Sequence, residues 1–393
     1  MKKVGIVTYQ DIADGKGRFL QAYALYSAIV KLGYDAEIID YSPINTETKK
    51  SSTWHKIIRA LMNPKRLPSY VAKLQHNILI MKYEKQFTGK RKKYETFING
   101  NIKITEKKYV GYQSLLDSQF VYDAYVCGSD QIWNPYFQGL DSAYYLKFAP
   151  QDKRIAYAPS LGTIQIDGQR KEILKENIKE MPYISVREKS GANLVTELIG
   201  REVKNVLDPT LLMSQEWWDD FAGGDIPDKP YVLTFFFDNS KFPRKVANQI
   251  AQEKGYDIIS IPDSFADIFF LSHKEISIGP ERFVNLFKNA SFVCTQSFHG
   301  VILSLIYNRS FYVFDRETKA YVSGVFSRIN DLLKIVGLED HILKSGQTIP
   351  NDRHEINYIR VNAILEEKRK ESMAYLKNSL GKATGGEQSV SID

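Results

Sequence analysis

The chain opens with two short apolar runs that flank a helical pattern, and this arrangement restricts the possible folds more than any other feature. The runs cover residues 4–8 and 36–41 and are rich in β-branched residues, as expected of buried parallel strands. Between them, apolar residues recur at helical spacing from Phe19 to Leu32, and Gly33 follows as a helix terminator. A strand–helix–strand unit of this length predicts a parallel sheet with right-handed crossovers.

Further apolar runs predict two such sheets in an α/β protein. We expect strands at residues 124–127, 155–158, 183–186 and 203–207, and then at 231–237, 257–261, 291–295 and 311–314. The Asp208-Pro209 step and a Gly223-Gly224 turn separate the two groups. The expected organisation is two Rossmann-like domains whose parallel sheets face a cleft, over residues 1–215 and 216–350. A helix over 351–380 and a disordered tail over 381–393 follow.

Composition narrows the class of protein. The 393 residues are 43% hydrophobic and 25% charged, which is typical of a globular protein with a full-sized core. The chain has only two cysteines, so a disulfide framework or a Cys-based zinc site is not expected and a reducing compartment is. No run has the signature of a signal peptide or a membrane span. These observations favour the cytoplasm.

Basic residues are concentrated in one segment. Residues 49–108 contain 16 Lys or Arg and 3 Glu, so this segment carries +13 while the whole chain carries +7 and the remainder −6. We expect a basic helical insertion in the first domain, over about residues 47–115. Three interpretations stay open: a solvated surface, attraction to anionic lipid at the membrane, and nucleic-acid binding, which is disfavoured because no recognition module surrounds the segment.

Polar residues follow the predicted strands, where ligands bind in open parallel sheets. The most suggestive set comes after strand 291–295: Ser297, His299 and Gly300 lead into an apolar helix. The amide groups at that helix start favour an anion, and a histidine there can act as general acid or base. The alternative is that His299 only caps the helix or satisfies buried carbonyl groups.

Other strand ends supply further candidates, which are ambiguous when taken singly. Arg187 could bind a carboxylate or phosphate with two parallel hydrogen bonds, or form an ordinary ion pair. Ser129 and Asp130 could bind a sugar. Gly17 lies in the first strand–helix loop, where phosphates often bind, but its surroundings match no phosphate-loop motif. Lys319 follows strand 311–314. The remaining histidines lack ligand-like spacing, so no metal site is expected.

Taken together, these stretches resemble the polysaccharide pyruvyl transferase family. The matching stretches span about residues 1–340 and are Gly5-Ile6-Val7-Thr8-Tyr9 with Leu20-Gln21-Ala22-Tyr23-Ala24-Leu25, Gly128-Ser129-Asp130-Gln131-Ile132-Trp133-Asn134, Ser185-Val186-Arg187-Glu188, Val206-Leu207-Asp208-Pro209-Thr210, and Ser297-Phe298-His299-Gly300. The resemblance implies a fold like that of GT-B glycosyltransferases. It also implies transfer of a pyruvyl group from phosphoenolpyruvate, without any other cofactor, to two hydroxyls of a sugar.

The resemblance also implies roles for particular residues. His299 is similar to the family's histidine near the donor, Arg187 to its arginine for the donor's anionic groups, and Lys319 to a further basic contact. The acceptor would be a saccharide of cell-surface polysaccharide biosynthesis, such as an exopolysaccharide or capsule. A lipid-linked acceptor would suit a basic protein lying peripherally on the inner face of the membrane.

One departure from the family pattern concerns the first loop. Members usually carry Asn-Tyr-Gly-Ala or a similar stretch before the Leu-Gln pair, whereas this chain has Gly15-Lys16-Gly17-Arg18. The acceptor therefore stays open. An alternative within the enzyme class is a glycosyltransferase with a nucleotide-sugar donor. In that case His299 or Asp130 would act as base, and Arg187 with Lys319 would hold the diphosphate.

Overall fold

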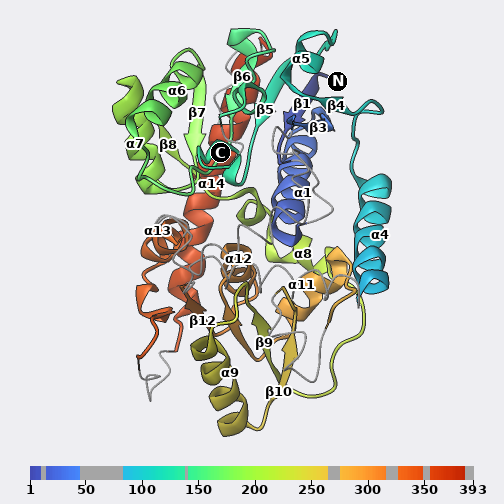
Figure 1. Ribbon diagram of the computed structural model, residues 1–393, viewed down its shortest axis with the longest axis vertical. Helices are drawn as coiled ribbons and strands as arrows, with labels where there is room; N and C mark the ends of the chain where they lie inside the picture. Colours follow the sequence, from blue (N-terminus) through green and yellow to red (C-terminus); the bar gives the residue numbers. More distant parts are fainter. Residues whose placement is uncertain are drawn as a thin grey trace, which may run out of the picture.

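Two parallel β-sheets, one in each half of an elongated molecule, form the framework of the protein (Figure 1). The computed structural model describes residues 1–9, 15–44, 83–137, 140–263, 275–315, 326–347 and 355–385. Helices cover both sheets, so the α/β class and the two Rossmann-like halves expected from the sequence are confirmed. The central strands, at residues 124–127, 154–156, 231–235, 292–295 and 311–314, are buried along their whole length, as parallel strands between helices require.

The first sheet has six strands that all pair in parallel. In spatial order they are β2 (Asp35–Ile38), β1 (Lys3–Val7), β5 (Ala124–Cys127), β6 (Arg154–Ala156), β7 (Tyr183–Val186) and β8 (Lys204–Asn205). The helices of this half are α1 (Lys16–Lys31), α5 (Tyr112–Leu116), α6 (Gly168–Ile178) and α7 (Lys189–Ile199). Short 3₁₀ turns lie at Gln131–Trp133, Ser142–Tyr145, Gln151–Lys153 and Pro209–Leu211.

The second sheet has five strands, again all parallel. In spatial order they are β10 (Asp257–Ser260), β9 (Tyr231–Phe235), β11 (Phe292–Thr295), β12 (Phe311–Phe314) and β13 (Ile342–Leu343). Its helices are α8 (Gln215–Phe221), α9 (Lys241–Lys254), α11 (Pro280–Lys288), α12 (Phe298–Ile306) and α13 (Ser327–Val336), with a 3₁₀ turn at Glu339–His341. All eight strands expected after the opening unit are present, although β8 is shorter than the run 203–207 suggested.

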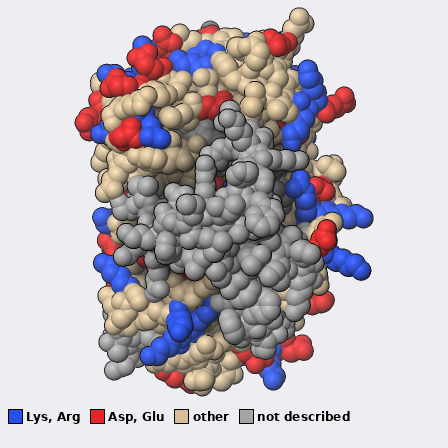
Figure 2. All heavy atoms as spheres, viewed as in Figure 1, with Lys and Arg blue, Asp and Glu red and all other residues tan. Residues whose placement is uncertain are grey.

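The basic insertion is only partly described, because residues 45–82 lie outside the described ranges. The described remainder is not wholly helical. Helix α4 (Glu84–Asn101) is followed by β4 (Tyr109–Val110), which pairs with β3 (Tyr41–Ser42). Nor is α4 purely peripheral: its Tyr94 is fully buried, and Lys93 donates from Nζ to the Ser277 carbonyl at 2.6 Å. Basic side chains project along this edge of the molecule (Figure 2).

Helix α14 (Tyr358–Ala383) runs along both halves (Figure 1). Near its start, the Tyr358 hydroxyl donates to the Arg309 carbonyl of the second half. Further along, the Ser372 hydroxyl accepts from the Leu207 amide of the first half at 2.9 Å. The helix continues to Ala383 and so enters the segment expected to be a disordered tail, of which residues 386–393 lie outside the described ranges. Within the described part of the chain, no helix has the length and apolarity needed to cross a bilayer.

Candidate active site

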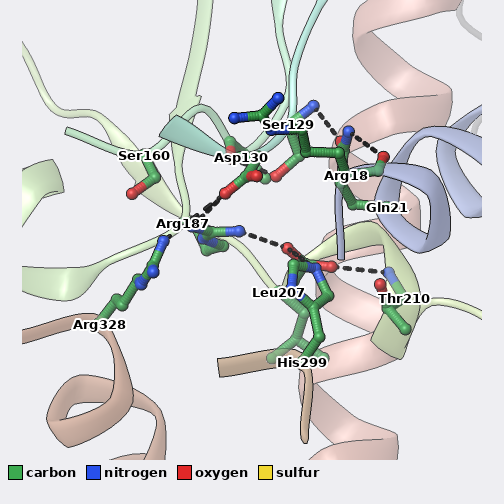
Figure 3. Close-up of polar contacts among 12 residues, drawn as sticks. Arg18, Gln21, Ser129, Asp130, Ser160, Arg187, Leu207, Thr210, His299 and Arg328 are labelled. Atoms are coloured by element: carbon green, nitrogen blue, oxygen red, sulfur yellow. Dashed lines mark hydrogen bonds and ion pairs between the residues drawn. The ribbon is translucent and has the colours of Figure 1, made fainter. Parts of the chain in front are cut away.

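Residues from both halves meet where the carboxyl ends of the two sheets face each other (Figure 3). Gly17, in the first turn of α1, lies directly against His299, in the first turn of α12. A Cβ atom added to Gly17 would lie 2.3 Å from Nδ1 of His299. Only glycine therefore fits at position 17, and its function here is steric.

Asp208 is the common partner of the two residues that the sequence singled out most clearly. Its Oδ2 accepts from a terminal guanidinium nitrogen of Arg187 at 2.7 Å and lies 3.8 Å from Nε2 of His299. Its Oδ1 accepts from the Thr210 amide at 2.9 Å, because the residue caps the turn after β8. The carboxylate is fully buried. Arg187 and His299, 112 positions apart in the sequence, are thus brought together.

Arg187 is surrounded by carboxylates of the protein. Besides Asp208, its guanidinium lies 3.4 Å from Glu188 and 3.4 Å from Asp130, and it stacks 4.4 Å from the centre of the Phe298 ring. Burial acts to lower the pKa of Arg187, but the three carboxylates outweigh it and raise the pKa above the ordinary value. The guanidinium is therefore fixed in place by internal ion pairs and is not a free cation facing a ligand.

His299 is buried, and its Nε2 has no hydrogen-bond partner among the residues that the structure describes. Burial lowers its pKa below the ordinary value, with a further contribution from Arg187 and Arg328, and the opposing effect of Asp208 and Asp130 does not cancel this. The imidazole is therefore neutral at neutral pH and can accept a proton. The capping role weighed for it in the sequence belongs instead to Ser297, whose hydroxyl accepts from the Gly300 amide at 3.2 Å.

Asp130 lies on the first-half side of the cluster, in the loop after β5. Its carboxylate lies 3.4 Å from Arg187 and 3.6 Å from Arg328 of α13, so it also contacts the second half. Burial acts to raise its pKa, but the positive charges of Arg187, Arg328 and Arg18, together with that of His299 when it is protonated, outweigh burial and lower it. Asp130 is thus an anion beside the imidazole.

Ser129 and Gly300 contribute to the architecture of the site. The Ser129 amide donates to Oε1 of Gln21 at 2.7 Å and its hydroxyl donates to the Ala158 carbonyl at 2.7 Å, so both groups are used internally. At Gly300, an added Cβ would lie 2.5 Å from Oγ1 of Thr295, so the helix packs closely against β11. Lys319 lies outside the described residues.

Four members of the cluster were not singled out as site residues from the sequence: Asp208, Glu188, Arg328 and Gln21. Asp208, Glu188 and Gln21 stood in stretches that matched the family, and for the first two the position just after a predicted strand was a usable signal. Arg328 had no such signal because it belongs to helix α13. Within the described ranges, no three His, Cys, Asp or Glu side chains are grouped so that they could hold a metal ion.

Comparison with known proteins gives one match to a family. A model of the family described as polysaccharide pyruvyl transferase matches residues 16–318, a range that includes every described residue of the cluster except Arg328 and ends one residue before Lys319. No significant match is found among curated proteins.

Solved structures with a similar fold share little sequence with this chain. Staphylococcus aureus TarM gives a TM-score of 0.46 at 10% identity, over 97% of this chain and 100% of that one. A UDP-GlcNAc 2-epimerase from Methanocaldococcus jannaschii gives 0.42 at 15% identity, over 94% of both chains. MurG from Acinetobacter baumannii gives 0.39 at 10% identity, over 98% and 95%. Nothing about substrates follows from likenesses of this degree.

Proposed function

The chain belongs to the polysaccharide pyruvyl transferase family, and on this premise we propose that it transfers a pyruvyl group from phosphoenolpyruvate to two hydroxyls of a sugar. The product would be a cyclic ketal. One observation supports this most strongly: His299 from one half and Arg187 from the other both contact the buried carboxylate of Asp208. Such a cluster provides a proton acceptor and fixed charges between two domains, as the reaction requires.

The proposed reaction is balanced without any further cofactor. The methylene carbon of phosphoenolpyruvate takes up a proton and becomes a methyl group, which leaves the adjacent carbon with oxocarbenium character. One sugar hydroxyl forms a C–O bond to that carbon, the C–O bond to phosphate breaks, and the second hydroxyl closes the ring. The sugar loses two hydroxyl protons. One of them balances the proton that the methylene carbon gains, and the other leaves with the phosphate.

In this scheme the methylene carbon takes its proton from solvent, and His299 then acts as a base. It is neutral at neutral pH, and no described residue forms a hydrogen bond with its Nε2, so it can accept the proton of the attacking hydroxyl. The imidazolium that forms is stabilised by the neighbouring carboxylates of Asp208 and Asp130. That imidazolium can then give its proton to the departing phosphate, which completes the acid–base role.

We assign Arg187 a positioning role. Its three ion pairs hold Asp208, Glu188 and Asp130 in place, so it orients the partners of His299. Neutralising the carboxylate and phosphate of the donor then falls to other cations, namely Arg328, which is only partly buried, and Lys319, as the family resemblance implies. The start of α12 adds amide donors on the same side.

The acceptor is proposed to be a saccharide in cell-surface polysaccharide biosynthesis, bound near Asp130. A carboxylate at that position can accept hydrogen bonds from sugar hydroxyls. A lipid-linked acceptor would place the protein peripherally at the inner face of the membrane, where basic residues such as those of α4 favour anionic lipid.

Ligand binding distinguishes the proposed pyruvyl transferase from the alternative, a glycosyltransferase with a nucleotide-sugar donor. Phosphoenolpyruvate at millimolar concentration should raise the melting temperature of the wild-type protein, and UDP alone should not stabilise it through the His299 site. Phosphate release should require both phosphoenolpyruvate and a saccharide. UDP stabilisation that disappears in His299→Ala, together with no effect of phosphoenolpyruvate, would favour the glycosyltransferase.

A further inference from the structure

A cavity lies at the carboxyl edge of the second sheet, apart from the Asp208 cluster. It has a volume of about 650 Å³ and is lined by residues 238–242, Lys245 and Ser345. The lining comes from the loop after β9, the start of α9 and the loop after β13. Its size is within the range of sites that bind small molecules.

The start of α9 carries an unusual set of charges for a helix. Lys241, Arg244 and Lys245 all lie within its first five residues, and its first turn contains no acidic residue. The amide end of a helix is its positive end, so cations there are unfavourable, and Lys241 and Lys245 also repel each other as neighbours one turn apart. Arg244 is held at this end, because it donates to the carbonyl groups of Ser240 and Asp238 at 2.7 and 2.9 Å.

Ser240 adds an independent observation. It is the residue that precedes the helix, yet its hydroxyl does not cap it, and among the described residues that hydroxyl has no hydrogen-bond partner. The residue is only 7% exposed and lines the cavity. The hydroxyl is therefore available to a ligand bound in the cavity.

We infer that this cavity binds a diphosphate group. One phosphoryl group would accept hydrogen bonds from the first amides of α9 and from the Ser240 hydroxyl, while the second would lie between Lys241 and Lys245. Phe242 in the wall provides an apolar surface for whatever the diphosphate carries. A diphosphate is the group that joins saccharides to nucleoside or lipid carriers, so the ligand class is a diphosphate-linked compound.

Gln296 connects this cavity with the candidate active site. It donates from Nε2 to Oδ1 of Asp238 at 3.2 Å and accepts from the Phe237 amide at 2.8 Å, and it stands three residues before His299. His299 and the cavity loop therefore follow two adjacent strands, β11 and β9, of the second sheet. The inference of diphosphate binding goes beyond the proposed pyruvyl transfer, and each of the two can be refuted without the other.

The test is direct binding of pyrophosphate to the full-length protein, measured by titration calorimetry. We expect Lys241→Gln with Lys245→Gln to weaken binding about tenfold or more, because two charge-assisted contacts are lost. Ser240→Ala should weaken it by a smaller factor. Inorganic phosphate should bind the wild-type protein more weakly than pyrophosphate does.

The matched control is Lys254→Gln with Lys334→Gln, which removes the same charge from the far end of α9 and from α13. Binding should be unchanged in this control and in His299→Ala, which tests the other site. No pyrophosphate binding to the wild-type protein, equal weakening by the control pair, or phosphate binding as tight as pyrophosphate would each overturn the inference.

Two further measurements test the charge repulsion at the helix start and the kind of compound that carries the diphosphate. Lys241→Glu should raise the melting temperature of the anion-free protein while it abolishes pyrophosphate binding, because it relieves repulsion at the helix start. A lower melting temperature in anion-free buffer would contradict the charge argument. UDP and geranyl diphosphate, tested in parallel, show whether the diphosphate is linked to a nucleoside or to a lipid. The compound that binds more tightly than pyrophosphate fits the rest of the cavity. Weaker binding of both compounds than of pyrophosphate would exclude a substituted diphosphate.

Discussion

At the scale of single residues, the arrangement depends on what Asp208 holds together. One of its oxygens meets Arg187 and faces His299, and the other caps the turn that positions it. A carboxylate in this position can keep the imidazole oriented and stabilise its protonated form. The same carboxylate holds Arg187 in place. One side chain therefore positions both Arg187 of the first half and His299 of the second half.

Replacing that carboxylate should affect both rate and pH dependence. Asp208→Asn keeps the acceptor for the Thr210 amide but removes the charge, so we expect kcat to fall at least about a hundredfold. The Asp208 charge raises the pKa of His299, so its removal should lower that pKa, and the acid limb of the pH–rate profile should move to lower pH.

Stability should fall in Asp208→Asn by about 3–5 kcal/mol, because the buried Arg187 loses a partner. Asp152→Asn, at an exposed position, is the control and should change neither rate nor profile. An acid limb that stays in place in Asp208→Asn would contradict the assignment of His299 as the titrating base.

Gly17 gives a steric test at the same scale. A methyl group at this position would lie 2.3 Å from Nδ1 of His299, so Gly17→Ala should displace the imidazole and lower kcat about tenfold to a hundredfold. Gly100→Ala in α4 has open space around its new methyl group and should leave kcat unchanged. Equal kcat values for the two variants would show that the position of His299 does not matter for turnover.

At the scale of secondary-structure elements, α14 supports the turn that carries Asp208. The Ser372 hydroxyl accepts from the Leu207 amide, immediately before Asp208. Ser372→Ala leaves that buried amide without a partner, so we expect a loss of about 1–3 kcal/mol in the free energy of unfolding and a fall in kcat. Ser379→Ala, on the same helix but without a partner at the site, should keep kcat. Chemical denaturation would measure the change in stability, and initial rates would measure the change in kcat. An unchanged kcat in Ser372→Ala would show that α14 does not affect the site.

The elements that the sequence predicted well are those with a local signal. The apolar strands and the helix after His299 were predicted because each is a continuous apolar run or a helical repeat. The pairing of Tyr41–Ser42 with Tyr109–Val110 was missed because two-residue strands leave no periodicity to detect. The course of α14 along both halves was also missed, since tertiary contacts such as the one to Leu207 decide it.

The candidate site was predictable in part for the same reason. His299, Arg187 and Asp130 follow strands directly, so the rule that ligands bind at strand ends identified them. The three ion pairs of Arg187 were not foreseen, because they need the folded positions of Asp208, Glu188 and Asp130 together. An arginine expected to face the donor is in fact enclosed by acids of its own chain.

At the scale of the whole molecule, the buried histidine links stability to pH. The pKa of His299 is lower in the folded protein than its ordinary value of 6.5, so the unfolded chain binds a proton first as the pH falls. Stability should therefore decrease as the pH falls from 7.5 to 5.5, by at most about 1.4 kcal/mol per pH unit for this one group. The pKa of Asp130 is also lowered by folding, so protonation of its carboxylate reduces the free energy of unfolding further, at still lower pH.

Urea denaturation at the two pH values would measure this effect. His299→Gln should show a smaller pH dependence than the wild-type protein between pH 7.5 and 5.5, because the group that titrates differently in the two states has been removed. The same slope in both proteins would show that His299 is not held neutral by its burial.

The central claim is that the two halves of the molecule together transfer a pyruvyl group to a sugar. The most direct measurement is mass spectrometry of a panel of saccharides, free and lipid-linked, incubated in deuterated water with phosphoenolpyruvate and the full-length protein. We expect an acceptor that gains pyruvic acid less one water, with one deuterium in the new methyl group, and no such product with His299→Ala. A pyruvylated product formed equally by His299→Ala, or transfer of a sugar from a nucleotide donor in place of any pyruvyl product, would contradict it.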